Sequence, residues 1–421
     1  MKRALGLLVL LAACGGDPDP RVIAGGGVGD GPIDGRLYVF VISEDDAALA
    51  GAQVAVGDVQ KTTDDKGFAQ FDDLHGPQTI AVAATGFRSA LLVGANGTNV
   101  TISLDHPVAP TPAQATLAGT ISNWNTVTVP AGHVKAALVQ YSQTDDLGDP
   151  ANKLVTPNMG NICGAATTTC DWTLVSRTGT VTLIAAVVDH DPTANTNTVI
   201  GWALRRDVAV TGGVDQTGLM LQLVEVGNLE TVTVDFGAPP AGLAQTVALV
   251  GEDIGEDDVL QLPQVLSTDR TTVLAPKPSL FGPDASYRLT SVAQTPSGDA
   301  GAQSIVLRRN NTAPALAAGE WLVPPTGVAA TRTHAELQPV ADAKIHSFNY
   351  RDLSGGEVLD ITILDGTTSV DIPALVAPTA VAGALTVRAA GIGADLDVTD
   401  FSLENDDDLL WGIAAEPITV P

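Results

Sequence analysis

The sequence predicts an all-β protein: a string of antiparallel β-sandwich domains that follows a short leader and a flexible tether. Short runs of Val, Thr, Leu and Ile alternate with Gly, Pro, Asp and Asn along the chain, which is the spacing of strands and turns. No long segment has the 3.6-residue period of an amphipathic helix. With 421 residues, 45% of them hydrophobic, the chain is long enough for about three or four domains with apolar cores.

The amino-terminal segment is typical of a secretory signal peptide. Residues 1–13 contain two cationic side chains and then an apolar run. That run is too short to cross a bilayer, which takes about 20 apolar residues. Leu11-Ala12-Ala13-Cys14 resembles the lipobox of bacterial lipoproteins. The resemblance implies cleavage before Cys14 and an extracytoplasmic protein held to a bacterial membrane by lipid on that cysteine. An ordinary signal peptide that contains a cysteine is the alternative.

The residues after the cysteine indicate a location and a spacer. Gly15 stands where lipoproteins retained in the enterobacterial inner membrane have Asp, which favours the outer membrane. Residues 14–33 are dense in Gly and Pro, with almost no side chain to pack. This composition predicts a flexible tether between the lipid and the folded part.

Residues 34–105 form the first predicted domain. The motifs are Gly35-Arg36-Leu37, a Leu49–Val56 turn and strand, a Thr62–Leu74 turn and strand, and a late Gly86-Phe87. Their order resembles the carboxypeptidase regulatory-like domain, a small transthyretin-like sandwich, with Leu37 where the family usually has Val. The resemblance implies a module without chemistry of its own. It also implies structural roles: Gly67 at a turn, and Phe68, Phe71, Leu74 and Val82 in the core.

The rest of the chain divides into a linker and three further sandwiches. Residues 106–114 are Pro-rich, 115–226 hold the Cys163–Cys170 loop, 227–313 are immunoglobulin-like, and 314–421 are immunoglobulin-like or fibronectin-like. The last two units resemble each other, because each has a strand, a proline, a short loop and a second strand. A looser third copy begins at Trp172.

The cysteines fit an oxidising compartment. With Cys14 assigned to the lipid, Cys163 and Cys170 remain and close a short loop. A disulfide between them is predicted, because a metal site needs more ligands than this loop offers.

The sequence lacks the motifs of common enzymes, and we expect no catalytic activity. The six histidines are scattered, and there is no His-Glu-x-x-His, Gly-x-Ser-x-Gly or phosphate-binding loop. The 48 acidic residues include enough carboxylates for the pair that a glycosidase needs. Such enzymes usually have many aromatic residues in the cleft, however, and aromatic residues make up only 4% of this chain. The net charge of −27 argues against nucleic acid as a partner.

The sequence predicts no cofactor, with calcium as the one candidate ligand. Asp189, Asp191, Asn195 and Asn197 place oxygen ligands at alternate positions of one loop, although the full EF-hand spacing is missing. A solvated acidic loop is the alternative. Two other acidic clusters, at 252–258 and 406–408, have the same two interpretations.

These observations predict a non-catalytic binding or scaffolding lipoprotein of the cell envelope. A carbohydrate-binding surface lipoprotein is the first alternative, and it requires two exposed tryptophans close together. Only the second unit has the candidates, which are Trp124, Trp172 and Trp202; Trp321 and Trp411 lie elsewhere. A calcium-stabilised adhesion protein is the other alternative. The expected partners are the membrane, through the lipid, and either a polysaccharide or an envelope protein.

Overall fold

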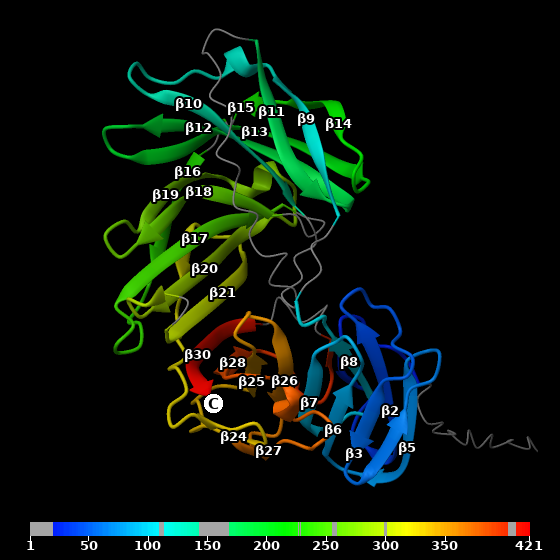
Figure 1. Ribbon diagram of the computed structural model, residues 1–421. Helices are drawn as coiled ribbons and strands as arrows, with labels where there is room; N and C mark the ends of the chain where they lie inside the picture. Colours follow the sequence, from blue (N-terminus) through cyan, green and yellow to red (C-terminus); the bar gives the residue numbers. More distant parts are fainter. Residues whose placement is uncertain are drawn as a thin grey trace, which may run out of the picture.

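The computed structural model describes residues 20–108, 113–142, 168–225, 227, 229–254, 259–298, 301–402 and 410–421 (Figure 1). Strands make up 58% of the structure and helices 3%, so the predicted all-β class with antiparallel sheets is confirmed. Short 3-10 helices lie between strands: η1 (Trp124–Thr126), η2 (Pro278–Leu280) and η4 (Pro378–Ala380). The predicted leader and Cys14 lie outside the described residues.

The first unit packs two layers of strands around one apolar core, to which Leu37, Phe71 and Val82 contribute. One layer has the order β29-β1-β8-β2-β5, and the other has β7-β6-β3-β4. The strands are β1 (Gly27–Gly29), β2 (Asp34–Ser43), β3 (Gln53–Val56), β4 (Val59–Thr62), β5 (Phe68–His75), β6 (Gln78–Ala83), β7 (Ser89–Ala95), β8 (Asn99–Leu104) and, from the far end of the chain, β29 (Phe401–Ser402).

Phe68 does not join the core, which corrects one expectation. Side chains alternate between the two faces of a strand, so residues three apart on β5 point in opposite directions. Phe71 therefore enters the core, whereas Phe68 packs on the outer face, with ring centroids 5.0 Å from Phe40 and 6.0 Å from Tyr38.

The predicted tether is too long at its carboxy-terminal end. Within residues 14–33, strand β1 pairs with β8 and with β29. A Cβ atom on Gly27 would stand 2.2 Å from the carbonyl oxygen of Phe401. Here glycine permits two backbones to approach, and the sequence pattern cannot distinguish this use of glycine from flexibility.

The second, third and fourth units have similar topologies. Their strands follow in chain order. The second unit has β9 (Gln114–Ser122), β10 (Val134–Ser142), β11 (Thr169–Arg177), β12 (Gly179–Asp191), β13 (Thr196–Val210), β14 (Gln216–Gln222) and β15 (Val224–Glu225). The third has β16 (Leu229–Asp235), β17 (Gln245–Asp253), β18 (Val259–Ser267), β19 (Thr272–Pro276), β20 (Ser286–Gln294), β21 (Gln303–Asn311) and β22 (Ala315–Ala317). The fourth has β23 (Ala329–Ala330), β24 (His334–Glu336), β25 (Ile345–Arg351), β26 (Glu357–Ile363), β27 (Ser369–Asp371), β28 (Leu385–Ala394) and β30 (Leu410–Val420).

In each copy a small sheet faces a large one. The small sheets are β11-β9-β14, β19-β16-β22 and β27-β24-β23. The fourth unit differs in its last-named strand, because β14 and β22 lie at or near the ends of their units and pair parallel, whereas β23 begins its unit and pairs antiparallel. In the large sheets the pairs β10–β12, β17–β20 and β25–β28 occupy equivalent places. The segments that resemble each other in sequence in the last two units form β19 with β20 and β27 with β28, which occupy equivalent places in the two copies.

The units are joined by shared sheets and cores. One twelve-stranded sheet runs through the third, fourth and first units in the order β18-β17-β20-β21-β30-β28-β25-β26-β7-β6-β3-β4. The second unit packs on the third through a common core, to which β12 contributes Ile184 and Val188 and β18 contributes Leu260. The spatial order is therefore second, third, fourth, first (Figure 1), so the two units at the ends of the chain are neighbours.

Candidate functional site

Only some of the predicted site residues lie in the part of the chain that the structure describes. Cys14 and Cys163 lie outside the described residues, as do the acidic residues at 255–258 and 406–408. Cys170 is buried on β11. The lipidation and the disulfide therefore stay predictions. Among the described residues, no helix is long and apolar enough to cross a membrane.

The four candidate calcium ligands do not converge. Asp189 and Asp191 lie on one face of β12, and the imidazole of His133 takes the place beside them, 2.8 Å from Asp189 Oδ1. Asn197 is on the opposite face, where its Oδ1 lies 2.9 Å from His190 Nδ1. Because side chains alternate between the two faces of a strand, the structure separates residues whose spacing in the sequence predicted one loop. Asn195 occupies the turn beyond β12. In the described part of the chain, no group of three or more His, Cys, Asp or Glu residues is placed to hold a metal ion.

The tryptophans of the second unit do not form an exposed platform. Trp124 and Trp172 are buried in its core. Trp202 packs against Phe281 of the third unit, with ring centroids 4.7 Å apart. Trp321 donates a hydrogen bond of 2.7 Å from Nε1 to the carbonyl of Phe236. The side chain of Trp411 is outside the described set. Carbohydrate binding was expected to require two exposed tryptophans close together, and Trp124, Trp172 and Trp202 do not provide them.

A charged cluster instead lies where the first unit meets the fourth. Arg88, just before β7, contacts Asp105 at 2.6 Å and Glu357 at 2.5 Å, and Asp360 lies within electrostatic range. The Arg88 side chain is only 16% exposed. Burial lowers its pKa, but the three carboxylates outweigh burial, and the net effect is a raised pKa. The guanidinium therefore stays charged and links the two units.

Burial acts on the carboxyl groups of this cluster as well. It raises the pKa of Asp105 to about 6, against the opposing effect of Arg88. It also raises the pKa of Asp360, again with Arg88 in opposition. The Asp105 carboxyl group therefore holds a proton under mildly acidic conditions. No local pattern in the sequence predicts this cluster, because Arg88 and Glu357 are 269 positions apart.

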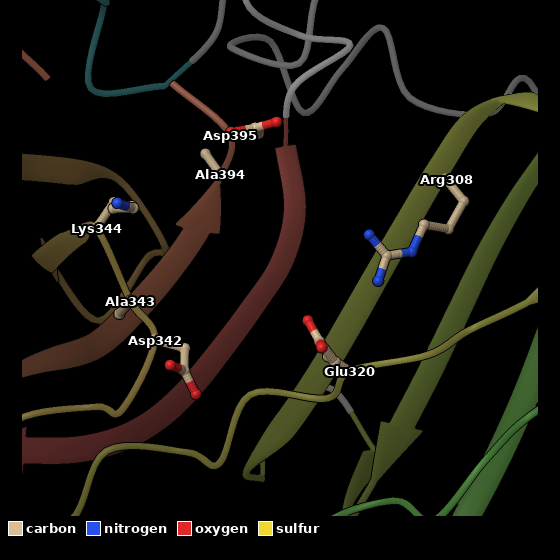
Figure 2. Close-up of a pocket in the computed structure, with 7 residues that line it drawn as sticks. All are labelled: Arg308, Glu320, Asp342, Ala343, Lys344, Ala394 and Asp395. Carbon is tan, nitrogen blue, oxygen red and sulfur yellow. The ribbon is translucent and has the colours of Figure 1, made fainter. Parts of the chain in front are cut away.

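An open cleft lies where the third unit meets the fourth (Figure 2). It has a volume of about 620 Å³. Figure 2 shows Arg308 of β21 and Glu320 on one wall, with Asp342, Lys344 and Asp395 on the other. Burial lowers the pKa of Arg308, and Glu320 opposes this effect. Cations and carboxylates on both walls suit a polar, charged ligand or peptide segment.

Comparisons with known proteins give little guidance. No family model and no curated protein matches this chain. Among solved structures, the Bacillus anthracis TIE protein is 12% identical over 61% of this chain and 44% of its own, with a TM-score of 0.15. BcpA, the major pilin subunit of Bacillus cereus, is 8% identical over 67% and 97% of the two chains, with a TM-score of 0.14. A tetra-tandem repeat from the extending region of a large adhesion protein is 11% identical over 91% and 98%, also at 0.14. This chain thus covers less than half of the first of these structures, and such scores carry no argument about function.

Proposed function

We propose that this chain is a non-catalytic bacterial lipoprotein, anchored to the outer membrane through Cys14, that serves as a rigid binding or scaffolding module of the cell envelope. The observation that carries the proposal is the continuous twelve-stranded sheet. Strand pairing fixes the relative orientation of three units, which a string joined by linkers would leave free. A tethered body of fixed shape can hold a partner at a set distance from the membrane.

The first unit supports the resemblance to the regulatory-like domain in one respect. A Cβ atom on Gly67 would lie 2.4 Å from the carbonyl oxygen of Val41, and Gly67 has a φ of +71°. The motif glycine is therefore required by its surroundings. Phe71 and Val82 occupy the core, in agreement with the structural roles that the resemblance implies.

The charged cleft is the place where we expect a partner, either an envelope protein or an acidic or basic polysaccharide. Its walls belong to different units, so a ligand that bridges them would also brace the junction. We propose no catalytic role for it.

The anchor is tested by expressing the full chain in a Gram-negative bacterium with a palmitate analogue that can be tagged. Label is expected on the wild type, in the outer-membrane fraction, and lost in Cys14→Ser. Equal labelling of both proteins would overturn the anchor. The scaffold is tested separately, by small-angle scattering of the chain from Gly15 onward. A single compact shape is expected, whereas a broad distribution of unit arrangements would overturn it.

A further inference from the structure

A carboxyl group without any partner lies in the core of the third unit. Glu252 of β17 is fully buried, and neither of its carboxyl oxygens has a hydrogen-bond partner. A buried polar group in this condition costs free energy, whether it is a carboxylate or a neutral acid, because a neutral acid also needs an acceptor. The position therefore calls for a partner that the polypeptide does not supply.

The surroundings of Glu252 offer further oxygen atoms. Glu252 stands directly opposite Tyr287 in the pairing of β17 with β20, which places their Cβ atoms roughly 5 Å apart. The Tyr287 hydroxyl reaches across the sandwich to Glu230 Oε1 at 2.6 Å and to the Pro276 carbonyl at 2.9 Å. Glu230 is half-buried and connects the cluster to solvent. A carboxylate, a phenol oxygen and a carbonyl thus lie together at one end of the core, and Glu252 interacts electrostatically with Glu230 and Tyr287.

The similar topologies of the second, third and fourth units show that this arrangement is particular to the third unit. The residue equivalent to Glu252 is the next-to-last of β10 in the second unit and of β25 in the fourth. Both are tyrosines, Tyr141 and Tyr350, and the Tyr350 hydroxyl donates to the Thr331 carbonyl at 3.0 Å. At this position the fourth unit therefore has a neutral hydroxyl with a hydrogen-bond partner, whereas the third unit has a carboxyl group without one.

We propose that Glu252, Glu230, Tyr287 and the Pro276 carbonyl form a binding site for one calcium ion. Oxygen-only ligands are those that calcium prefers, and calcium accepts irregular geometry with carbonyl and carboxylate ligands. The two positive charges of calcium balance two carboxylates, whereas a single proton neutralises only one of them. Burial, followed by the charge of Glu230, raises the pKa of Glu252 to about 9, so the ion competes with a proton at neutral pH. The site is independent of the proposed function and of the loop at Asp189.

The experiment uses the chain from Gly15 onward at neutral pH, in buffer of constant ionic strength with either calcium or a chelator. Melting temperature and proton release are both measured as calcium is added. The test variant is Glu252→Gln, which keeps the shape and removes the charge. The controls are Glu336→Gln, at an exposed glutamate, and Asp191→Asn, at the end of β12 in the second unit.

Calcium is expected to raise the melting temperature of the wild type progressively and to release about one proton. Glu252→Gln should lose both responses, with apparent affinity weakened roughly tenfold or more, while both controls keep them. The melting temperature in chelator shows whether Glu252→Gln is folded. Absence of a calcium response in the wild type would overturn the proposal and leave water as the missing partner. A response that survives in Glu252→Gln would also overturn it, because calcium would then bind elsewhere.

Discussion

On one side of the fourth unit β26 pairs with β7 of the first unit, and on the other side β30 pairs with β21 of the third. The first junction has five residue pairs, a second contact between β1 and β29, and the buried Arg88 cluster. The second has three residue pairs, a small apolar cluster of Leu322, Val340 and Ala414, and the open cleft. The junction between residues farthest apart in sequence is thus the closed one. Distance along the chain says little about how firmly two units are joined.

The largest expected effect comes from removing the buried cation of the closed junction. Arg88→Met should lower the free energy of unfolding by about 3–5 kcal/mol, because Asp105 loses its ion pair, Asp360 loses a nearby cation, and Glu357 keeps only Arg351. Urea unfolding of the chain from Gly15 onward measures this. The matched control is Arg36→Met, at an ion pair with both side chains about half exposed, where about 0–1 kcal/mol is expected. Equal losses in the two variants would mean that the Arg88 cluster does not hold the junction.

The closed junction should also depend on pH. Asp105 has a folded-state pKa of about 6, above the ordinary 3.8, so the unfolded chain holds fewer protons between these values. The stability that Asp105 contributes is therefore fully present below about pH 4 and is lost as pH rises through 6. The change is at most about 3 kcal/mol, from 1.36 kcal/mol per pKa unit. Asp105→Asn should remove this slope. Parallel stability curves for wild type and variant over pH 4–6.5 would contradict the assignment.

A smaller effect is expected where β1 meets β29. Gly27→Ala places a methyl group against the Phe401 carbonyl, and forcing the strands apart should cost about 1–3 kcal/mol. Gly31→Ala is the control for backbone strain, because nothing lies within 4 Å of its Cβ position and only its φ of +72° opposes the change, whereas Gly27 has both a φ of +154° and the close contact. The comparison is made by thermal unfolding. A loss in Gly31→Ala as large as that in Gly27→Ala would show that close approach of the strands is not the cause.

The smallest effect is expected in the open junction. Asp342 lines the cleft, is exposed, and has a φ of +66°, which asparagine also tolerates. Asp342→Asn therefore removes a charge with little other change, and should shift stability by no more than about 0.5 kcal/mol. Chemical denaturation checks this value. A loss as large as that of Arg88→Met would mean that the two junctions do not differ as described.

The elements that the sequence predicted well are those in which local pattern and tertiary role agree. The predicted turn and strand at Leu49–Val56 contain β3, and those at Thr62–Leu74 contain most of β5. The strand that carries the closed junction, β7, was not predicted. Its sequence from Ser89 to Ala95 has small residues and a glycine, and its partner is supplied by the fourth unit. Pairing between distant segments leaves no local signal.

The candidate sites were harder to predict for the same reason. The spacing of Asp189 and Asn197 suggested a loop, but the strands continue far enough to place their side chains on opposite faces. Arg88 was not singled out, and Glu252 was considered only as one residue of the acidic cluster at 252–258, because charged residues in a sequence do not reveal burial. Their environment depends on which strands lie opposite, and only the three-dimensional structure determines that.

The pairing of β7 with β26 has a consequence for how the molecule is made. A chain emerges from the ribosome amino terminus first, so the first unit appears long before Leu359 and its neighbours. Until they arrive, β7 is an open sheet edge that can pair with the wrong chain. The exposed edge of the first unit is therefore covered only after β26 has been made, and pairing between the two halves of the chain completes this sheet.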